Sequence, residues 1–433
     1  MMSSIVCLSY PCGAGISCAN PIRATLWGSV RLQSRLLAVC LGLWSSVPMA
    51  DDNESALALH YFGTAGLVHN TTGPADFIRD LSQRDGVNGG QWSVTLDTVV
   101  GVQASYAVNE QLDIVAQGVS RHHYDNNYTP ELTWAFVKYS PRSHIELRGG
   151  RLGLDFYMRA DSRLVGYSYL TVRPSVDYYG ALPYQYFDGL DAAFTLPMGE
   201  GLLRAKLFGG YSPESIPFEN SVPWDGSGSP ELGANLDYQW DSWQFRISYA
   251  QISHARDFPG LITDLVTALQ TVPSPNAQAA ADALAAGRAT SRHYSAGVVY
   301  DEGPLQMQLM ASGVKYDTAL FQDSIAGYFL AGYRLGEVTP YAGLSWSRSS
   351  ATRLDSTGIP AFDAAIASAI GLSSTNQHTY TLGLRWDFHT GMDLKVQWDA
   401  VCGASDSVFL YRWDQPGWNG QTQVWSAALD FAF

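Results

Sequence analysis

The side chains that could do chemistry in this 433-residue chain are mostly arginine, lysine and aspartate. Many of them occupy every second position of a short segment, as do Lys395, Gln397 and Asp399, with apolar residues between them. Such groups attract, orient or repel charged solutes, but they break no covalent bond by themselves. The sequence has no Gly-x-Ser-x-Gly motif and no glycine-rich phosphate loop with its lysine, so it does not indicate a hydrolase of that type or a nucleotide-binding enzyme.

A metal or cofactor site is not indicated either. His122, His123 and Asp125 lie together and could bind a metal ion, but adjacent His side chains cannot easily reach one ion. Four of the five Cys residues fall within the first fifty residues, leaving Cys402 as the one Cys beyond them. We therefore expect no cysteine-based metal site, no metal and no cofactor. The net charge of −14 argues against a nucleic-acid partner.

The elements that position the polar side chains are segments of strict polar–apolar alternation, such as 379–388 and 393–399. Successive side chains of a β-strand point to opposite faces, so each segment has one apolar and one polar face. A soluble β-sandwich and a membrane barrel would both show this pattern. Aromatic residues at segment ends, such as Tyr238 and Trp240 before the Asp241-Ser242 turn, favour the barrel, because Trp and Tyr gather at membrane interfaces.

The composition agrees with a barrel. Charged residues make up 15% of the chain and aromatic residues 12%, while the hydrophobic fraction is an ordinary 46%. A soluble protein of this size usually has about a quarter charged residues. Because no apolar run of about 18 residues follows the N-terminal segment, a helical membrane span is not expected there.

The alternation predicts an all-β fold, a transmembrane antiparallel β-barrel of about sixteen strands. An even number lets the first strand pair with the last and removes the edges that lipid would not tolerate. The expected strands begin near Ala56, Trp92, Leu112, Glu131, His144, Asp188, Leu202, Glu231, Trp243, Arg292, Leu305, Ser324, Thr339, Gln377, Asp393 and Gln421.

Short and long links alternate between these segments, as in outer-membrane barrels with short periplasmic turns and longer external loops. Two long links contain helix-like inserts, at 261–269 with 277–286 and at 361–372, which are either lids over the mouth or surface decoration. The long links lie around 70–90, 122–130, 153–187, 212–230, 255–291, 317–323, 349–376 and 400–420.

The N-terminus reads as an export signal. Arg31 and Arg35 precede an apolar core from Leu36 to Trp44, which is too short to span a membrane, and a small residue, Ala50, stands before an acidic start. We expect residues 1–50 to be a cleaved signal peptide with an over-extended start, and residues 51–433 to form the barrel.

The chain ends on a strand whose apolar face includes Phe431 and Phe433. This end resembles the C-terminal assembly signal of outer-membrane proteins, in which a terminal aromatic residue is typical. The segments 144–152, 161–168 and 172–174 resemble an uncharacterised branch of Gram-negative porin-like proteins. The resemblance implies an outer-membrane location beside lipopolysaccharide, insertion by the barrel assembly machinery, a homotrimer, and a third external loop, here about 153–187, folded into the lumen.

A barrel of sixteen strands leaves an aqueous channel, so inward positions should be polar and should select solutes. We expect a porin for passive diffusion of small polar or charged solutes, not an enzyme. The alternatives are a structural or adhesive barrel and an outer-membrane hydrolase. The loop charges could create a field across a constriction or pair to hold the loop, and its tyrosines could guide solutes or simply pack. The expected pore-lining or constriction residues are Arg148, Arg151, Arg159, Asp161, Arg163, Arg173, Asp188, Arg204, Lys206, Arg246, Arg385 and Lys395.

Overall fold

The computed structural model describes residues 56–219, 222–287, 289–407, 411–413 and 417–433. The expected signal peptide, residues 1–50, lies outside the described residues. No helix in the described part of the chain is long and apolar enough to cross a membrane.

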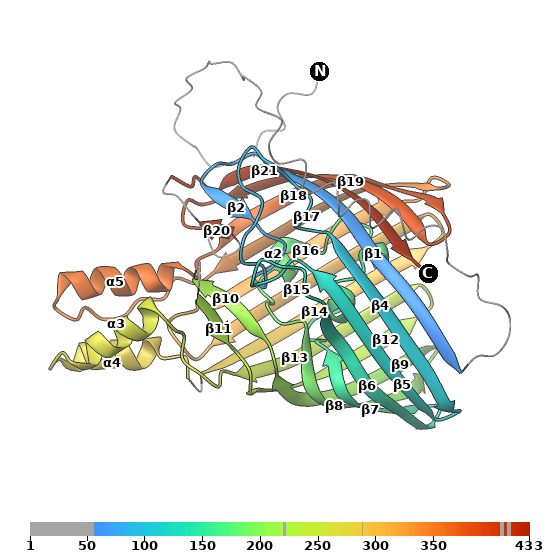
Figure 1. Cartoon of the computed structure of the whole chain (residues 1–433), viewed down its shortest axis with the longest axis horizontal. Coiled ribbons are helices and arrows are strands. Elements are labelled where there is room, and N and C mark those ends of the chain that lie inside the picture. Colours follow the sequence, from blue (N-terminus) through green and yellow to red (C-terminus); the bar gives the residue numbers. More distant parts are fainter. Residues whose placement is uncertain (1–55, 220–221, 288, 408–410, 414–416) are drawn as a thin grey trace, which may run out of the picture. The chain divides into compact units, whose positions relative to one another are not determined.

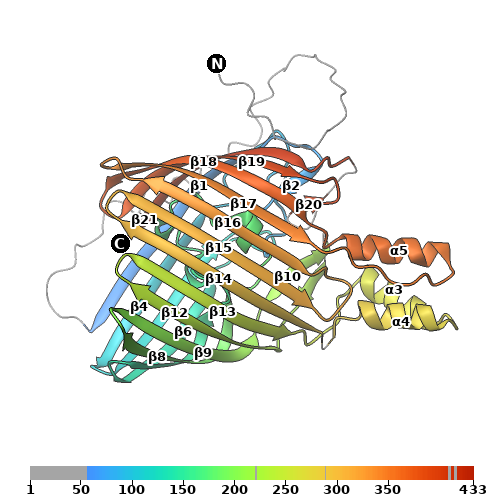
Figure 2. The ribbon, with the colours of Figure 1, turned by 180° about the vertical axis from the view of Figure 1, so that it is seen from behind.

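Within the described residues, sixteen antiparallel strands close into one barrel, as the alternation predicted (Figures 1 and 2). The last strand pairs with the first, with Phe431 opposite Gly63 and Trp425 opposite His69. The strands are β1 (Leu57–Asn70), β4 (Val99–Asn109), β5 (Leu112–Arg121), β6 (Glu131–Arg142), β7 (Ile145–Gly153), β8 (Tyr186–Met198), β9 (Gly201–Ser212), β12 (Ser229–Trp240), β13 (Trp243–Ser253), β14 (Thr290–Glu302), β15 (Leu305–Tyr316), β16 (Ser324–Tyr333), β17 (Val338–Ser349), β18 (Asn376–His389), β19 (Met392–Gly403) and β21 (Gln421–Ala432).

One predicted strand start was wrong. Trp92 begins only the two-residue strand β3 (Trp92–Ser93), and the second barrel strand, β4, begins at Val99. Between them, the Thr98 hydroxyl donates to the carbonyl of Val94, and the Ser93 hydroxyl lies 2.8 Å from that of Thr95. Such side-chain bonds to nearby polar groups compete with the strand ladder, which explains the interruption.

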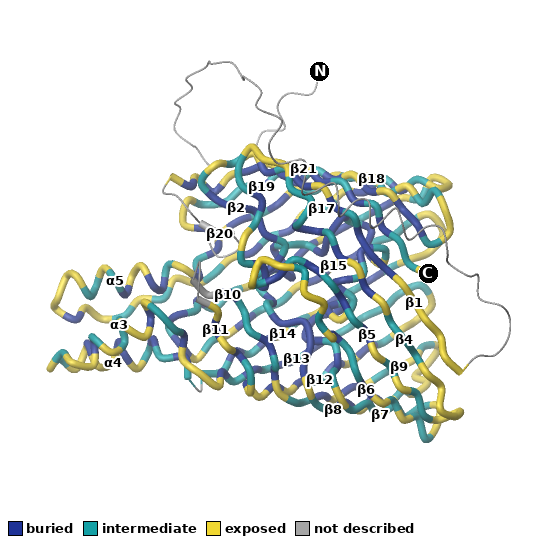
Figure 3. Tube along the Cα trace, viewed as in Figure 1, coloured by how far each residue is buried: buried dark blue, intermediate teal, exposed yellow. Residues whose placement is uncertain are grey.

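The alternation of each strand separates a lipid-like outer face from a polar inner face. On β19, Lys395 and Asp399 are buried, whereas Leu394 and Val396 between them are 39% and 47% exposed. A soluble sandwich would bury its apolar side chains and expose the polar ones, so this inversion indicates a membrane barrel. Figure 3 shows buried and exposed positions alternating along the strands.

The long links carry the remaining elements. Helices α3 and α4 lie between β13 and β14, and α5 lies between β17 and β18, close to the two predicted inserts (Figure 1). The additional elements are β2 (Ala75–Phe77), η2 (Ala160–Ser162), η3 (Gly166–Ser168), α2 (Val176–Tyr179), β10 (Ser215–Glu219), β11 (Val222–Asp225), α3 (Leu261–Gln270), α4 (Pro275–Leu284), α5 (Pro360–Gly371) and β20 (Tyr411–Trp413).

Candidate functional site: the barrel lumen and the third loop

The third long link, residues 154–185, joins β7 to β8 and contacts inward side chains on both sides of the barrel. At its start, Asp155 is 4% exposed and accepts hydrogen bonds from Lys206 of β9 and, at 2.6 Å, from Arg246 of β13. The amide of Asn235 on β12 donates to the same carboxylate at 2.9 Å. Burial by itself would raise the pKa of Asp155, but the two cations outweigh it and hold that pKa below its usual range.

Further along, Arg173 ties the loop to the wall formed by the closing strands. Its guanidinium donates to both carboxylate oxygens of Asp97, at 2.7 to 3.1 Å, in a bidentate pair. The same group donates to Ser426 of β21 at 2.6 Å and to Asp399 of β19 at 3.4 Å. Since the side chains of Arg173 and Asp97 are only 2% and 1% exposed, this pair is fully desolvated.

Two cations of the wall reach the middle of the loop. Lys395 donates to the carbonyl of Gly166 at 2.8 Å and forms an ion pair with Asp430 of β21 at 2.9 Å. Arg385 of β18 donates to the carbonyls of Tyr167 and Tyr169 at 2.9 and 3.0 Å. These contacts hold the loop backbone itself and do not depend on its side chains.

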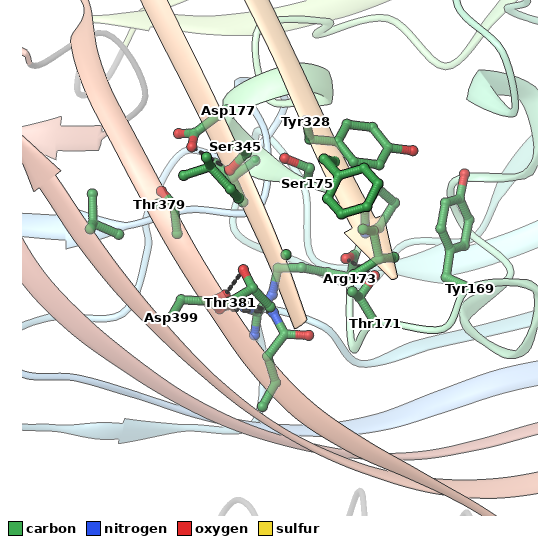
Figure 4. A pocket seen from close by; sticks show the side chains of 18 of the residues that line it. Tyr169, Thr171, Arg173, Ser175, Asp177, Tyr328, Ser345, Thr379, Thr381 and Asp399 are labelled. Atoms are coloured by element: carbon green, nitrogen blue, oxygen red, sulfur yellow. Dashed lines mark hydrogen bonds and ion pairs between the residues drawn. The ribbon is translucent and has the colours of Figure 1, made fainter. Parts of the chain in front are cut away.

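A cavity of about 50 Å³ lies between the segment 171–177 of the loop and the strands β15 to β19 (Figure 4). Asp177 lines it and accepts hydrogen bonds from the hydroxyl of Ser345 and the amide of Gln377. Asp399 lines its other side and accepts from the hydroxyl of Thr381 at 2.7 Å. The cavity has room for a few water molecules.

The tyrosines of the loop mainly pack. Tyr157, Tyr178 and Tyr179 are each 2% exposed, and the rings of Tyr178 and Tyr179 lie 5.3 and 6.1 Å from that of Tyr328 on β16. The hydroxyl of Tyr157 lies 3.1 Å from Nδ1 of His293 on β14. Burial raises the pKa of all three loop tyrosines. Their contacts fit the packing interpretation, not a track for solutes.

The other side of the lumen is more open. Arg148 and Glu146 on β7 have side-chain exposures of 22% and 32%, and Arg204 on β9 reaches 38%. Arg204 pairs with Glu146 at 2.9 Å, and Arg148 hydrogen-bonds to Asp191 of β8. Asp161 of the loop is also exposed. Polar side chains that are inward and yet half-exposed border space that the protein does not fill.

Three of the expected pore residues face elsewhere. Arg151 lies four residues from the outward Leu147 on β7, which is 40% exposed, and its register partner Asp188 lies two residues from Leu190, which is 68% exposed. Arg151 and Asp188 therefore form an ion pair on the outer face. Arg163 is 3% exposed and donates to the carbonyls of Ala160, Leu182 and Tyr184 within the loop, so its charge fixes the loop fold and does not line the lumen.

The remaining expected residues lie on the inner face or on the third loop. The structure brings them together in three groups, each with its own acidic partners. The groups are Lys206 with Arg246, Arg148 with Arg204, and Arg385 with Lys395; Arg159, Asp161 and Arg173 belong to the loop.

Asp393 and Asp430 were missed as site residues, although both are 0% exposed partners of Lys395. The sequence pattern indicates an inward position for Asp430, since Asp430 alternates with the apolar Leu429 and Phe431 on the last strand. Within the described residues, no group of three His, Cys, Asp or Glu side chains could hold a metal ion.

No protein-family model and no curated protein matches the chain significantly. Solved structures do. OmpF of Salmonella typhi in complex with daunomycin is 11% identical, covering 87% of this chain and 97% of that chain, with a TM-score of 0.52. OmpT, an outer-membrane protein of Vibrio cholerae, is 10% identical over 90% and 100% of the two chains, with a TM-score of 0.51.

A third match is an anion-selective porin from Comamonas acidovorans, 12% identical over 87% of this chain and 100% of that one, with a TM-score of 0.50. At such identities the likeness concerns the fold. The chain has the fold of the porin-like outer-membrane β-barrels.

Proposed function

We propose that this protein is an outer-membrane porin, a water-filled channel through which small polar or charged solutes diffuse passively. It uses no cofactor and catalyses no reaction. Export by a cleaved signal peptide, insertion by the barrel assembly machinery and assembly as a homotrimer belong to the same proposal.

The observation that carries the proposal is the half-exposed polar lining between β7 and β9. Arg148, Glu146 and Arg204 face inward and keep 22%, 32% and 38% of their side-chain surface accessible. A purely structural barrel would gain more from filling this space with apolar side chains, because burying apolar surface stabilises a fold. Charges left beside open space act on solutes instead.

The loop contacts suggest that the passage is narrow. Anchors at Asp155 and at Arg173 hold the loop against opposite sets of strands. We take the path to run beside β7 and β9, where Arg148 and Arg204 stay partly exposed. We place the constriction between the loop residues Arg159 and Asp161 and the wall residues Arg148 and Arg204. Both signs of charge occur there, so solutes of either sign experience attraction and repulsion in the same short segment.

Planar-bilayer recording tests the channel directly. Purified, folded protein should produce discrete conductance steps, and silence after verified insertion into the bilayer would refute the porin and leave a structural or adhesive barrel.

A matched pair of variants tests the proposed lining. Arg204→Gln should shift the reversal potential in a salt gradient toward cation preference, since it removes a half-exposed inward cation. Arg151→Gln removes the same charge from the outer face and should leave the reversal potential unchanged. Equal shifts in both variants would contradict the assignment of faces.

A further inference from the structure

The wall of the barrel is interrupted beside its first strand. The ladder between β1 and β4 covers Leu57 to Thr64 of β1, and the ladder between β1 and β3 begins at Val68. In this fully described part of the chain, residues 65–67 of β1 therefore face the five residues 94–98 without a ladder between them. At their other edge, residues 65–67 pair in register with β21, the last strand (Figure 1). A backbone ladder thus holds this stretch of β1 from one edge alone.

A missing side chain lets another residue lie against this stretch on the lumen side. Gly66 occupies an inward position, since Thr64 and Val68 on either side of it are buried. A Cβ atom built on Gly66 would lie 2.7 Å from the Cβ of Asp97. The backbone N–H of Gly66 donates to the hydroxyl of Thr98 at 3.1 Å. Glycine at this position therefore allows the segment that carries Asp97 to approach β1 closely.

Arg173 of the third loop connects the two edges of this stretch. At the interrupted edge, its guanidinium bonds to both carboxylate oxygens of Asp97, at 2.7 to 3.1 Å. At the other edge it donates to Ser426 of β21 at 2.6 Å and to Asp399 of β19 at 3.4 Å (Figure 4). Because the side chains of Arg173 and Asp97 are only 2% and 1% exposed, salt and water screen this connection little.

The loop backbone also lies on the junction between the first and last strands. The hydroxyl of Thr64 on β1 donates to the carboxylate of Asp430 on β21, and this hydrogen bond spans the junction. Gly166 of the loop packs so closely on the pair that a Cβ atom there would overlap both side chains. Lys395 of β19 donates to the carbonyl of Gly166 at 2.8 Å and pairs with Asp430 at 2.9 Å. The loop segment 166–173 therefore contacts the wall from the edge of β4 to β19.

We propose that the third loop is an internal strap that keeps the barrel closed at the interrupted junction beside β1. While the segment 166–173 is docked, β1 cannot separate from residues 94–98, because Arg173 holds Asp97 and the closing strands together. Such an opening would leave backbone groups unpaired in lipid, which cannot satisfy them. Thr64 and Asp430 are 366 residues apart in the chain, so closing the ring costs chain entropy, and the bonds of the strap offset part of that cost. The strap concerns the wall of the barrel and is independent of conduction.

Hydrogen–deuterium exchange of the folded, full exported protein in detergent micelles tests the strap. The measured quantity is the exchange rate of peptides from residues 62–70 of β1, divided by the rate for β15, whose ladders to both neighbours have no interruption. Arg173→Met should raise this ratio about a hundredfold or more, because breaking a buried ion pair favours local opening by such a factor. Asp155→Asn is the matched control. It weakens the anchor of the same loop at Lys206, far from β1 in the wall, and should leave the ratio unchanged.

A double variant distinguishes a strap from the effect of a lone buried charge. R173M/D97N removes both partners, so no unpaired carboxylate remains, and the strap predicts that the ratio stays raised. A return to the wild-type ratio would show that the unpaired Asp97 alone had opened β1, and would overturn the proposal. Faster exchange of the loop in R173M with wild-type exchange of β1 would also overturn it, because Arg173 would then hold only the loop.

A milder variant keeps the test decisive if R173M does not fold. R173K retains the charge but loses the bidentate geometry, and it should raise the ratio about tenfold. A wild-type ratio in R173K measured in that case would overturn the strap. Because no current is measured, a silent channel does not affect these experiments, and failure of the strap leaves the proposed channel untouched.

Discussion

Arg173 anchors the third loop through a buried ion pair with Asp97, and replacing it should widen the proposed passage. Arg173→Met keeps most of the side-chain volume but removes the guanidinium that bonds to Asp97, Asp399 and Ser426. It leaves Asp97, 1% exposed, without its cation. Breaking one partner of a buried ion pair typically costs about 3–5 kcal/mol.

That cost applies to the docked position of the loop segment around 171–174, because Asp177 keeps its hydrogen bonds to Ser345 and Gln377. At about 1.4 kcal/mol per factor of ten, it shifts docking by roughly a hundredfold to a few thousandfold. The anchors at Asp155, Lys395 and Asp177 are untouched, so only this short segment should leave the wall. The single-channel conductance should rise, and the reversal potential should move toward cation preference because Asp97 and Asp399 are no longer neutralised.

Recording in planar bilayers measures both quantities, with Arg151→Met as the control. Arg151 pairs with Asp188 on the outer face, where the two side chains are 26% and 48% exposed. An exposed pair contributes at most about 1 kcal/mol, so that variant should conduct like the wild type. If folded Arg173→Met protein has wild-type conductance and wild-type selectivity, the buried pair does not hold the loop and the reasoning fails.

Three further predictions follow from other contacts. Asp155→Asn should lower the free energy of unfolding by about 3–5 kcal/mol in urea titration, because Lys206 loses its acidic partner in a buried site. Burial and the nearby Glu131 raise the pKa of Glu214 to about 8, although backbone N–H donors lower it. In the folded protein Glu214 is therefore protonated below about pH 8. Its contribution to stability is therefore full below about pH 4.5 and lost as the pH rises to 8, and Glu214→Gln should flatten the melting temperature over that window. Phe433→Ser should reduce the amount of barrel assembled in the outer membrane, measured by surface labelling of intact cells, without changing single-channel conductance.

The barrel could be predicted from the sequence because its signals are local. Period-two alternation, turn lengths and aromatic residues at strand ends each depend on neighbours within a few residues. The structure places Arg246, Arg385 and Lys395 on the inner face, and their role as pore-lining residues stays a prediction. The error at Trp92 came from a local competition, in which the hydroxyl of Thr98 bonds to the backbone four residues earlier.

The pairing of charges inside the lumen could not be predicted. Arg173 meets Asp97 and Asp399, which are 76 and 226 residues away in the chain, so only closure of the whole barrel brings them together. The orientation of Arg151, by contrast, could have been predicted from the sequence. It lies three residues from the inward Arg148, and an odd spacing on a strand places two side chains on opposite faces.

The contacts of the third loop divide the lumenal charges into two roles. Asp155 and Arg173 are buried and form ion pairs with Lys206 and Asp97 of the barrel wall, so their charges fix the position of the loop. A loop crossing a polar lumen finds little apolar wall to pack against, and directional ion pairs define its position where hydrophobic contact could not. Asp161 and Arg204 stay exposed, and under the proposed function their charges act on passing solutes. In the proposed channel, the buried pairs would set the width and the exposed groups would set the charge preference, so the two properties should be separable by substitution.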